Sequence, residues 1–525
     1  MKRMIVLAVA AAVATVHVEA LYAEVTPYID AAEMPNLIKC LPAPPDTLSP
    51  DFNYDLTQYI WGKQQRNDPE RAAIARRDAV SKYINVLAEF SIPFGLTITP
   101  TETPEIWKLL DTSLVTVNQM SKAAKNYYDR PRPFVRFHEH MLTYQAEEDE
   151  EKQALEGSYP SGHTLRSWTA ALLLSEIAPS RADTILARGY MCGESRVIVG
   201  AHWQTDVDAS RLGAVIGYMR LQTSEAFRQQ MKKAQQEYAQ KTGVEIKPSA
   251  SDNIVRDSCD YYYTRSEMPD MRKFLPAPPD TMDLKFTRDV MYYYWGKTMR
   301  HNTERAEMAR RDAEYGIDYI CPEFSDAFGL QLSKEGTPEI YKLMLDATST
   351  IDSICYEPKK FYMRKRPFMR MQETSLTPGD EAALSKNGSY PSGHTILGWG
   401  SALLLSELNP AKADTLIARG YQYGESRLIV GAHWRSDVDA GRLAASVAYA
   451  RLHNSARFQE QLKKAKEEFR RLTDPTAIRQ INNNNSEFTT DASRAAVYDL
   501  QGRRVDDTAR PGIYISNQEK YVVRQ

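Results

Sequence analysis

Cysteine is scarce in this sequence, and the positions of the few cysteines exclude one class of site. None of the five in 525 residues stands at a metal-ligand spacing, so a zinc site is not supported, and we expect no metal or other cofactor. The odd number allows at most two disulfides, whose pairing the sequence leaves open. The cysteines are Cys40, Cys192, Cys259, Cys321 and Cys355.

An excess of one charge is also missing. Lysine and arginine number 66, and aspartate and glutamate number 68, so we expect no nucleic acid and no acidic membrane surface as the main partner. Beyond the N-terminal region no long apolar run occurs, because "ALLLSEI" from Ala171 and "ALLLSEL" from Ala402 are short and contain Ser and Glu. These segments predict buried helices rather than stable membrane insertion.

The first twenty residues have the pattern of a cleaved secretory signal peptide. Two basic residues precede an apolar stretch over residues 4–16, and a small-residue cleavage site ends at Ala20. His17 and Glu19 interrupt the run before it reaches the roughly 20 apolar residues that a membrane anchor needs. We therefore expect an exported protein, in the periplasm, at the cell surface or in the extracellular space.

The remaining chain contains one domain twice. "LPAPPDT" begins at Leu41 and again at Leu275, and the octapeptide "GSYPSGHT" begins at Gly157 and again at Gly388. The second copy is three residues shorter than the first between its heptapeptide and its octapeptide, because the two octapeptides are slightly closer together in the chain than the two heptapeptides. A period of this length corresponds to a whole domain and excludes solenoid repeats, whose periods are about 20 to 50 residues.

Within each copy the apolar pattern predicts helices. "PERAAIARRDAVSKYINVLAEF" from Pro69 places apolar residues three and four apart, and strand patterns are sparse. We expect an all-α fold with two tandem helical-bundle domains, separated near residues 241–253, where Gly, Pro, Ser and Asn gather.

A different pattern follows the second copy. "INNNNSEFTTD" predicts a polar linker, and the alternating segments "AAVYDLQGRRV" and "GIYISNQEKYVVR" predict a small β tail. The expected divisions are a signal peptide over residues 1–20, repeats over 21–245 and 246–475, a linker over 476–493 and the β tail over 494–525.

Each octapeptide lies between two clusters of cationic and histidine residues. Upstream, Lys125 precedes Arg132 by seven residues; downstream, "GESRVIVGAHW" holds Arg196 and His202, and Asp206 follows. The second copy has every corresponding residue, in the same order. They are Lys359, Arg366, Ser392, Gly393, His394, Arg427, His433 and Asp437.

The cations predict a site for phosphate. Lys125, Arg132 and Arg196 stay charged near neutral pH, and arginine forks fit a tetrahedral oxyanion. Ser161 is the expected N-cap of a helix, and Gly162 lets the backbone approach closely, so unpaired N–H groups would face the anion. We therefore interpret each octapeptide as a helix start that holds an oxyanion.

The histidines predict what happens to the phosphate. Cleaving a phosphate ester needs a nucleophile at phosphorus and a proton for the leaving oxygen, and imidazole can supply either at mild pH. Asp206 lies four residues after His202 and can accept its second ring proton, which orients the ring and stabilises the imidazolium. His202 is therefore the better nucleophile and His163 the better acid.

These motifs carry a family resemblance. Lys-x6-Arg-Pro, Pro-Ser-Gly-His and Ser-Arg-x5-His-x3-Asp resemble the type 2 phosphatidic acid phosphatase and vanadium haloperoxidase superfamily. "GSYPSGHT" with "GESR" and "DVDA" is most similar to its soluble branch, the bacterial class A non-specific acid phosphatases. The resemblance covers nearly the whole of both copies and implies an all-helical, metal-independent phosphomonoesterase with a phosphohistidine intermediate.

The resemblance also implies a role for each motif residue. The nucleophiles would be His202 and His433, their partners Asp206 and Asp437, and the leaving-group acids His163 and His394. Phosphoryl oxygens would be held in the first site by Lys125, Arg132, Ser161, Gly162 and Arg196, and in the second by Lys359, Arg366, Ser392, Gly393 and Arg427.

Other functions fit parts of the same pattern. A vanadate-dependent haloperoxidase would hold vanadate where phosphate binds, and one repeat could instead be a non-catalytic phosphate-binding domain. Added vanadate would abolish phosphatase activity but would be required for halide oxidation, so one assay separates the two enzymes. A lipid pyrophosphate phosphatase is disfavoured because membrane spans are not predicted.

Two expectations concern assembly and export. The duplication suggests that the repeats pack as a pseudo-symmetric pair in place of a homodimer. The tail resembles the C-terminal sorting tails of type IX secretion substrates in the runs from Val497 to Val505 and from Gly512 to Arg524, which implies an encounter with secretion machinery. The alternative for the tail is a small β accessory that protects the C-terminus.

Overall fold

The structure is a computed structural model that describes residues 25–80, 83–244, 255–256, 259–474, 497–499, 512–516 and 519–523. The predicted signal peptide and the predicted linker lie wholly outside these residues, and so does most of the boundary at 241–253. The chain divides into two compact units, Met1–Lys463 and Lys464–Gln525.

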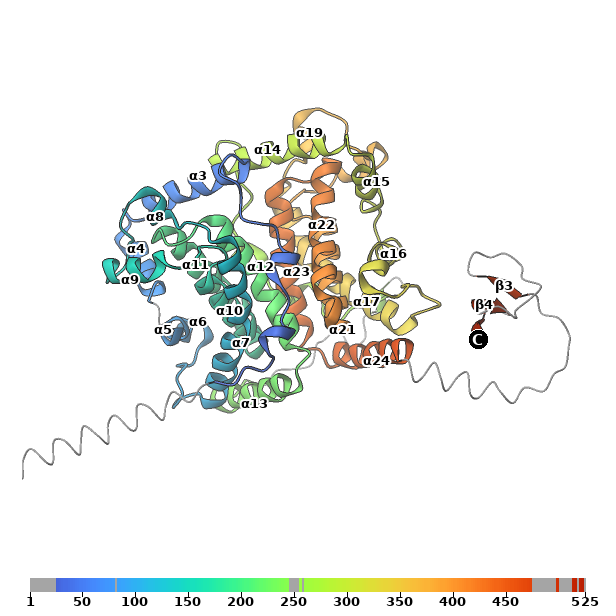
Figure 1. The fold of residues 1–525 in the computed structure, drawn as a ribbon, viewed down its shortest axis with the longest axis horizontal. Coiled ribbons are helices and arrows are strands. Elements are labelled where there is room, and N and C mark those ends of the chain that lie inside the picture. Colours follow the sequence, from blue (N-terminus) through green and yellow to red (C-terminus); the bar gives the residue numbers. More distant parts are fainter. Residues whose placement is uncertain are drawn as a thin grey trace, which may run out of the picture. The chain divides into compact units, whose positions relative to one another are not determined.

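Both repeats are built from helices, which confirms the predicted all-α fold class (Figure 1). The first repeat contains η2 (Ala31–Glu33), α2 (Leu37–Cys40), α3 (Pro50–Gln65), α4 (Pro69–Asp78), α5 (Tyr83–Ala88), α6 (Ser91–Phe94), α7 (Pro104–Tyr128), α8 (Pro133–Phe137), α9 (Ala146–Ala154), α10 (Gly162–Ile177), η3 (Pro179–Arg181), α11 (Ala182–Ile198), α12 (Gln204–Leu221) and α13 (Glu225–Thr242).

The second repeat follows the same order with small changes. It contains η4 (Arg265–Glu267), η5 (Met271–Lys273), α14 (Leu284–Met299), α15 (Thr303–Arg311), α16 (Ile317–Phe328), α17 (Pro338–Asp352), η6 (Ser353–Cys355), α18 (Tyr356–Tyr362), α19 (Pro367–Met371), η7 (Pro378–Asp380), α20 (Glu381–Leu384), α21 (Gly393–Leu408), η8 (Pro410–Lys412), α22 (Ala413–Val430), α23 (Arg435–Leu452) and α24 (Ala456–Thr473). The long α7 of the first repeat corresponds to α17, η6 and α18.

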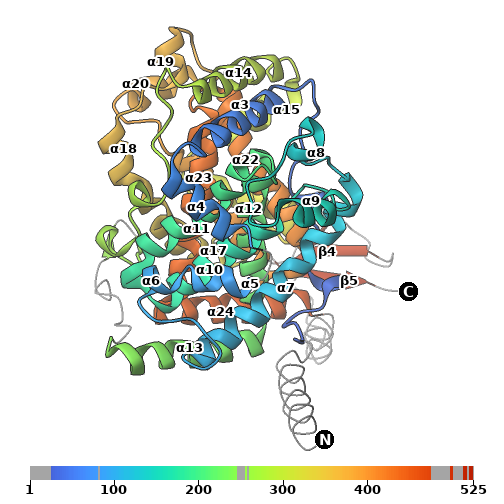
Figure 2. The same ribbon diagram turned by 90° about the vertical axis from the view of Figure 1, so that its left-hand side faces the viewer.

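Helices α10 and α21 form the centre of the two repeats. Both are apolar along most of their length and buried on nearly every face, so each needs neighbours all round. Helix α10 packs against α7, α11 and α12, and α21 packs against α17, α22 and α23. Contacts between α12 and α23 and between α3 and α14 join the repeats within one unit (Figures 1 and 2).

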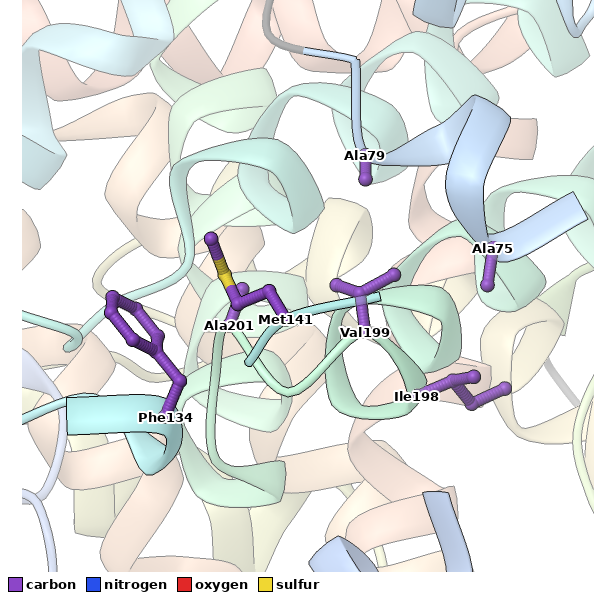
Figure 3. Packing of buried hydrophobic residues seen from close by; sticks show 7 residues of the cluster. All are labelled: Ala75, Ala79, Phe134, Met141, Ile198, Val199 and Ala201. Carbon is purple, nitrogen blue, oxygen red and sulfur yellow. The ribbon is translucent and has the colours of Figure 1, made fainter. Parts of the chain in front are cut away.

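An apolar cluster fixes the turn between α11 and α12, which carries His202. Ile198, Val199 and Ala201 of this turn pack with Phe134 and Met141 (Figure 3). Gly200 adopts a positive φ of 78°, which glycine tolerates without strain. A side chain there would also lie 2.9 Å from Arg66 Nη2. The sharp turn places His202 close to the end of α11.

The described strands are short. β1 (Val255–Arg256) pairs antiparallel with β2 (Cys259–Asp260) between the repeats. In the C-terminal unit β4 (Gly512–Ser516) pairs antiparallel with both β3 (Val497–Asp499) and β5 (Glu519–Val523).

Two further predictions can be compared with the structure. Cys40, Cys192, Cys321 and Cys355 are buried and form no disulfide with one another, while the side chain of Cys259 lies outside the described structure. Among the described residues, no helix combines the length and the apolar character that crossing a membrane requires.

Candidate active site

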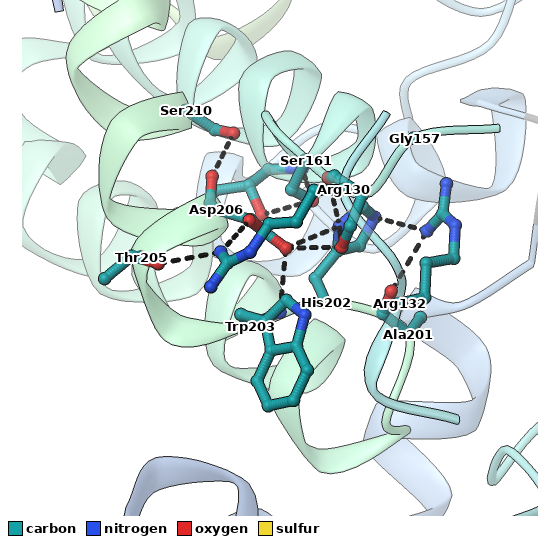
Figure 4. A network of polar contacts seen from close by, with 12 residues as sticks. Arg130, Arg132, Gly157, Ser161, Ala201, His202, Trp203, Thr205, Asp206 and Ser210 are labelled. Carbon is teal, nitrogen blue, oxygen red and sulfur yellow. Dashed lines mark hydrogen bonds and ion pairs between the residues drawn. The ribbon is translucent and has the colours of Figure 1, made fainter. Parts of the chain in front are cut away.

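The imidazole of His202 lies at the centre of the first site, just after the turn that follows α11 (Figure 4). Its Nδ1 lies 2.9 Å from the backbone oxygen of Ser158, and its Nε2 lies 3.0 Å from Nη1 of Arg132. Because a guanidinium only donates hydrogen bonds, Nε2 must accept, and the proton of the neutral ring is on Nδ1. The lone pair of Nε2 therefore points toward the cations.

Asp206 lies behind this ring, but its closest contacts are to other groups. Its Oδ2 is 3.6 Å from His202 Nδ1, longer than the hydrogen bond to the Ser158 carbonyl. Oδ2 accepts hydrogen bonds from the Ser158 hydroxyl at 2.5 Å and from the Trp203 amide at 2.9 Å. Its second oxygen contacts Arg130. Asp206 thus places negative charge beside the ring, while Ser158 supplies the direct acceptor.

Arg130 is a residue of this site that the sequence analysis missed. Its guanidinium contacts Asp206 Oδ1 at 2.5 Å and Asp55 Oδ2 at 2.6 Å, and both carboxylates are fully buried. Burial alone would raise the pKa of Asp206, but Arg130 and the accepted hydrogen bonds hold it below its ordinary value. This direction favours the ionised form of Asp206. The recurrence of the arginine as Arg364 was the available signal.

Of the three predicted cations, Arg132 contacts Nε2 of His202, Lys125 acts on that ring through its charge, and Arg196 lies within electrostatic range of Arg132. Lys125 donates to the Gly157 carbonyl at 2.7 Å, and Arg132 donates to the Ala201 carbonyl at 3.0 Å. All three guanidinium nitrogens of Arg196 are buried and have no hydrogen-bond partner in the described part of the chain. Buried polar groups are normally satisfied, so these unpaired donors are suited to bind an anionic ligand.

Burial in a cationic cluster depresses the pKa values of these groups. Burial and Arg132 lower the pKa of Lys125 to about 7, and the same two causes lower the pKa of Arg196 to about 9. Burial also lowers the pKa of Arg132 to about 10. Binding an anion would relieve the repulsion among them.

The octapeptide contributes the start of α10. Ser161 is its N-cap, and the Ser161 hydroxyl accepts from the Thr164 amide at 3.4 Å. His163 lies in the first turn, and its Nε2 is buried without a partner in the described part of the chain. Burial, and then Arg196 and Arg166, hold the pKa of His163 well below its ordinary value. His163 thus lies within electrostatic range of Arg196, His202 and Arg132.

The second site repeats this geometry. Arg366 Nη1 lies 3.0 Å from His433 Nε2, and Lys359 donates to the Gly388 carbonyl at 3.2 Å. Nε and Nη1 of Arg427 are buried without a partner within the described ranges. Arg364 joins Asp437 to Asp289 at 2.5 and 2.6 Å. Ser392 is the N-cap of α21, which begins at Gly393.

The two sites differ at both histidines. Asp437 Oδ2 lies 3.5 Å from His433 Nδ1, but neither this nitrogen nor the Ser389 hydroxyl has a hydrogen-bond partner within the described ranges. His394 Nε2 lies 2.8 Å from the Ala313 carbonyl oxygen and donates to it. The second site opens into a cleft of about 740 Å³, lined by Lys359, His394, Arg427 and His433 among others.

The sequence analysis also missed a buried hydrogen-bond network next to Arg196. The hydroxyl of Ser195 donates to Asp78 Oδ2 at 2.6 Å and accepts from Arg71 at 3.0 Å, and Asp78 also pairs with Arg188. Ser195 directly precedes Arg196, so this buried network fixes the part of α11 that carries Arg196. In the second repeat Ser426, Asp312, Arg305 and Arg419 form the same network.

The fold and the site define a class that comparison with known proteins also identifies. The family model of the PAP2 superfamily matches residues 107–228 and 343–459, one segment in each repeat. The chain belongs to this superfamily.

The relatives identify the activity within the superfamily. The chain is 45% identical over 213 residues to the non-specific acid phosphatase of Providencia stuartii, covering 40% of this chain and 86% of that protein. It is 38% identical over 208 residues to the non-specific acid phosphatase of Salmonella typhimurium, covering 39% and 83%. The protein is an acid phosphatase of the PAP2 superfamily.

A solved structure is also similar. The crystal structure of the first bacterial vanadium-dependent iodoperoxidase is 12% identical, with a TM-score of 0.25, covering 79% of this chain and 98% of that one.

Proposed function

We propose that the protein hydrolyses phosphomonoesters without a metal ion, at two complete active sites, through phosphohistidine intermediates on His202 and His433. The observation that carries the proposal is the buried guanidinium of Arg196, whose three nitrogens have no partner in the described structure, together with the accepting Nε2 of His202, which faces Arg132. An oxyanion between them would satisfy the donors and present phosphorus to the lone pair.

The chemistry follows from this placement. Nε2 of His202 attacks phosphorus, the bond from phosphorus to the ester oxygen breaks, and His163 gives its proton to the leaving oxygen. Water then attacks the phosphohistidine, His163 takes a proton from it, the P–N bond breaks and inorganic phosphate leaves. Asp206 and the Ser158 carbonyl stabilise the ring while it carries the phosphoryl group.

The proton donor needs a raised pKa in the complex. In the free site burial and the arginines keep His163 neutral by lowering its pKa. A bound phosphoryl group places negative charge among Arg196, Arg132 and His163 and opposes that effect. The second site follows the same scheme, but His394 must first give up its hydrogen bond to Ala313 or use Nδ1.

Trapping the intermediate tests the proposal. The wild-type protein is quenched during turnover of a chromogenic phosphomonoester in the presence of chelator, and its peptides are searched by mass spectrometry under alkaline conditions. We expect phosphate on His202 and on His433, and each single alanine variant should lose only its own label. Label on another residue would contradict the mechanism, as would a requirement for vanadate in halide oxidation without phosphatase activity.

We also propose that the protein is exported and that the repeats act as a pseudo-symmetric pair. Support for export comes from the basic and apolar pattern of residues 1–20 and from the tail's resemblance to type IX sorting signals. The pairing is supported by contacts between repeats, including Asn454 to the Glu176 carbonyl at 2.9 Å and Arg288 to Asp51 at 2.9 Å. Fractionation of the native host, with and without residues 494–525, tests the export.

A further inference from the structure

We infer that the two sites select leaving groups of different charge, and that the second site favours phosphomonoesters whose leaving group carries an ammonium group. The inference rests on the proposed function at both sites. It deepens that function, because the phosphate-holding residues are the same in both repeats and read only the shared phosphoryl group. Selection among leaving groups must therefore come from side chains beside the phosphate-holding residues.

One such position carries a different charge in each repeat. When the repeats are aligned on their "LPAPPDT" segments, Asn118 on α7 corresponds to Asp352 at the end of α17. Both side chains face the glycine that starts the central helix: a Cβ on Gly162 would lie 3.5 Å from Asn118 Oδ1, and a Cβ on Gly393 would lie 3.1 Å from Asp352 Oδ1. The exchange places a carboxylate beside the second phosphate site.

The Asp352 carboxylate can accept further donors. Its Oδ2 accepts from the Tyr315 hydroxyl at 2.6 Å, and its Oδ1 lies 3.6 Å from Cys355 Sγ. A carboxylate has about four acceptor positions, so at least one remains for a ligand. Asp352 forms no ion pair with any other described residue, and it lines the 740 Å³ cleft together with Lys359 and His394. The charge of Asp352 acts on Lys359 without a direct ion pair, so a cationic ligand can bind to the carboxylate directly.

A second position strengthens the contrast. When the repeats are aligned on their octapeptides, Arg166 on α10 corresponds to Leu397 on α21. Arg166 acts electrostatically on three groups of the first site, since its charge contributes to the lowered pKa values of Lys125, His163 and Arg196. The first site thus has an extra cation and a neutral Asn118, where the second has an apolar side chain and a carboxylate.

Aromatic rings complete the second cleft. Tyr315 and Tyr319 line it and are 53% and 51% exposed, and the Tyr315 ring lies 5.1 Å from the His394 ring. Their counterparts are Ser81 and Asn85. Tyrosine faces bind alkylated ammonium groups through cation–π attraction. Five other charged residues line the cleft and are exposed, namely Arg265, Glu314, Lys360, Asp380 and Lys386. Asp352 is the carboxylate that lies beside Gly393 of the phosphate site, so the preference is assigned to it.

Two probes that differ only in charge test the inference. Phosphocholine carries a quaternary ammonium group, and 3,3-dimethylbutyl phosphate is its neutral carbon isostere. The ratio of their kcat/KM values is measured in H202A, where only the second site can act, and in H433A, where only the first can act. We expect the ratio to be about tenfold higher in H202A.

Reciprocal exchanges serve as the control. D352N added to H202A should lower the ratio by most of that factor, and N118D added to H433A should raise it. Equal ratios in the two single variants, or a ratio that D352N leaves unchanged, would overturn the inference. If H202A hydrolysed neither probe, the proposed function of the second site would fail instead. Calorimetric binding of both probes to the double alanine variant, with and without D352N, then decides the charge preference.

Discussion

The two repeats agree where a phosphoryl group would bind and differ where the rest of a substrate would lie. Arg132 and Arg366 stand at the same 3.0 Å from their histidines, and Arg196 and Arg427 are both buried with unpaired nitrogens in the described structure. Around them the residues diverge, as at Asn118 and Asp352. The comparison separates what the reaction requires from what the substrate decides.

The contacts between the repeats are also unequal. Arg288 pairs with Asp51 at 2.9 Å and with Asp439 at 2.7 Å. In the alignment on the "LPAPPDT" segments, Arg288 corresponds to Tyr54 and Asp51 to Lys285, so the two residues that would form the mirror-related pair are not of opposite charge. A duplicated chain can change one copy alone, which two identical subunits cannot do.

The largest expected effect comes from the carboxylate behind each nucleophile. D206N in the H433A background, and D437N in the H202A background, should each lower kcat about 10³-fold or more, because a neutral amide no longer stabilises the charged ring. Steady-state kinetics on a chromogenic phosphomonoester measures both. A loss confined to one repeat would show that the two sites do not share one mechanism.

The next largest effect should come from replacing the buried arginine of each site, Arg196 or Arg427. R196K in H433A and R427K in H202A should each lower kcat/KM about 10²-fold, since lysine keeps the charge but loses the fork that holds two oxygens. Inorganic phosphate should also inhibit each variant less. Nearly unchanged kinetics would contradict a direct contact between these arginines and the phosphoryl group.

A more modest effect is expected on the pH profile. Burial lowers the pKa of Lys359 in the second site as well, but the charge of Asp352 opposes it. Because the pKa of Lys125 is lowered to about 7, the first site loses this cation as the pH rises through that value, and kcat/KM of H433A should fall there. N118D adds an anion near Lys125, which favours the charged form of its ammonium group, so the fall in kcat/KM should move to higher pH. If the fall stays at the same pH in N118D, or persists in K125R, a group other than Lys125 causes it.

The smallest expected effects are on stability. R288A should lower the free energy of unfolding by about 2 kcal/mol, because it removes the ion-pair partner of Asp51 and one of the three arginines that pair with Asp439. K297A, which breaks the exposed pair with Glu373, should cost less than about 1 kcal/mol. Denaturant unfolding measures both. Equal effects would show that Arg288 does not join the repeats.

Local rules predicted the part of the site at the start of α10, and the repeated motifs with their family resemblance predicted the residues that lie far from it along the chain. The N-cap at Ser161 and the histidine two residues later follow from local rules that need no tertiary information. Arg130 could not be assigned in this way, because its partners Asp55 and Asp206 lie 75 and 76 residues away and their burial gives the contact its importance. The same holds for Asp352, which only folding brings beside Gly393.

The activity of the two single nucleophile variants decides whether both repeats are enzymes. Hydrolysis of one neutral chromogenic phosphomonoester is measured with chelator present for wild type, H202A, H433A and the double variant. If both repeats are complete phosphatases, each single variant keeps part of the activity, the two parts sum to the wild-type kcat, and the double variant keeps none. If one single variant loses everything, only one repeat is catalytic and the account of two active sites is wrong.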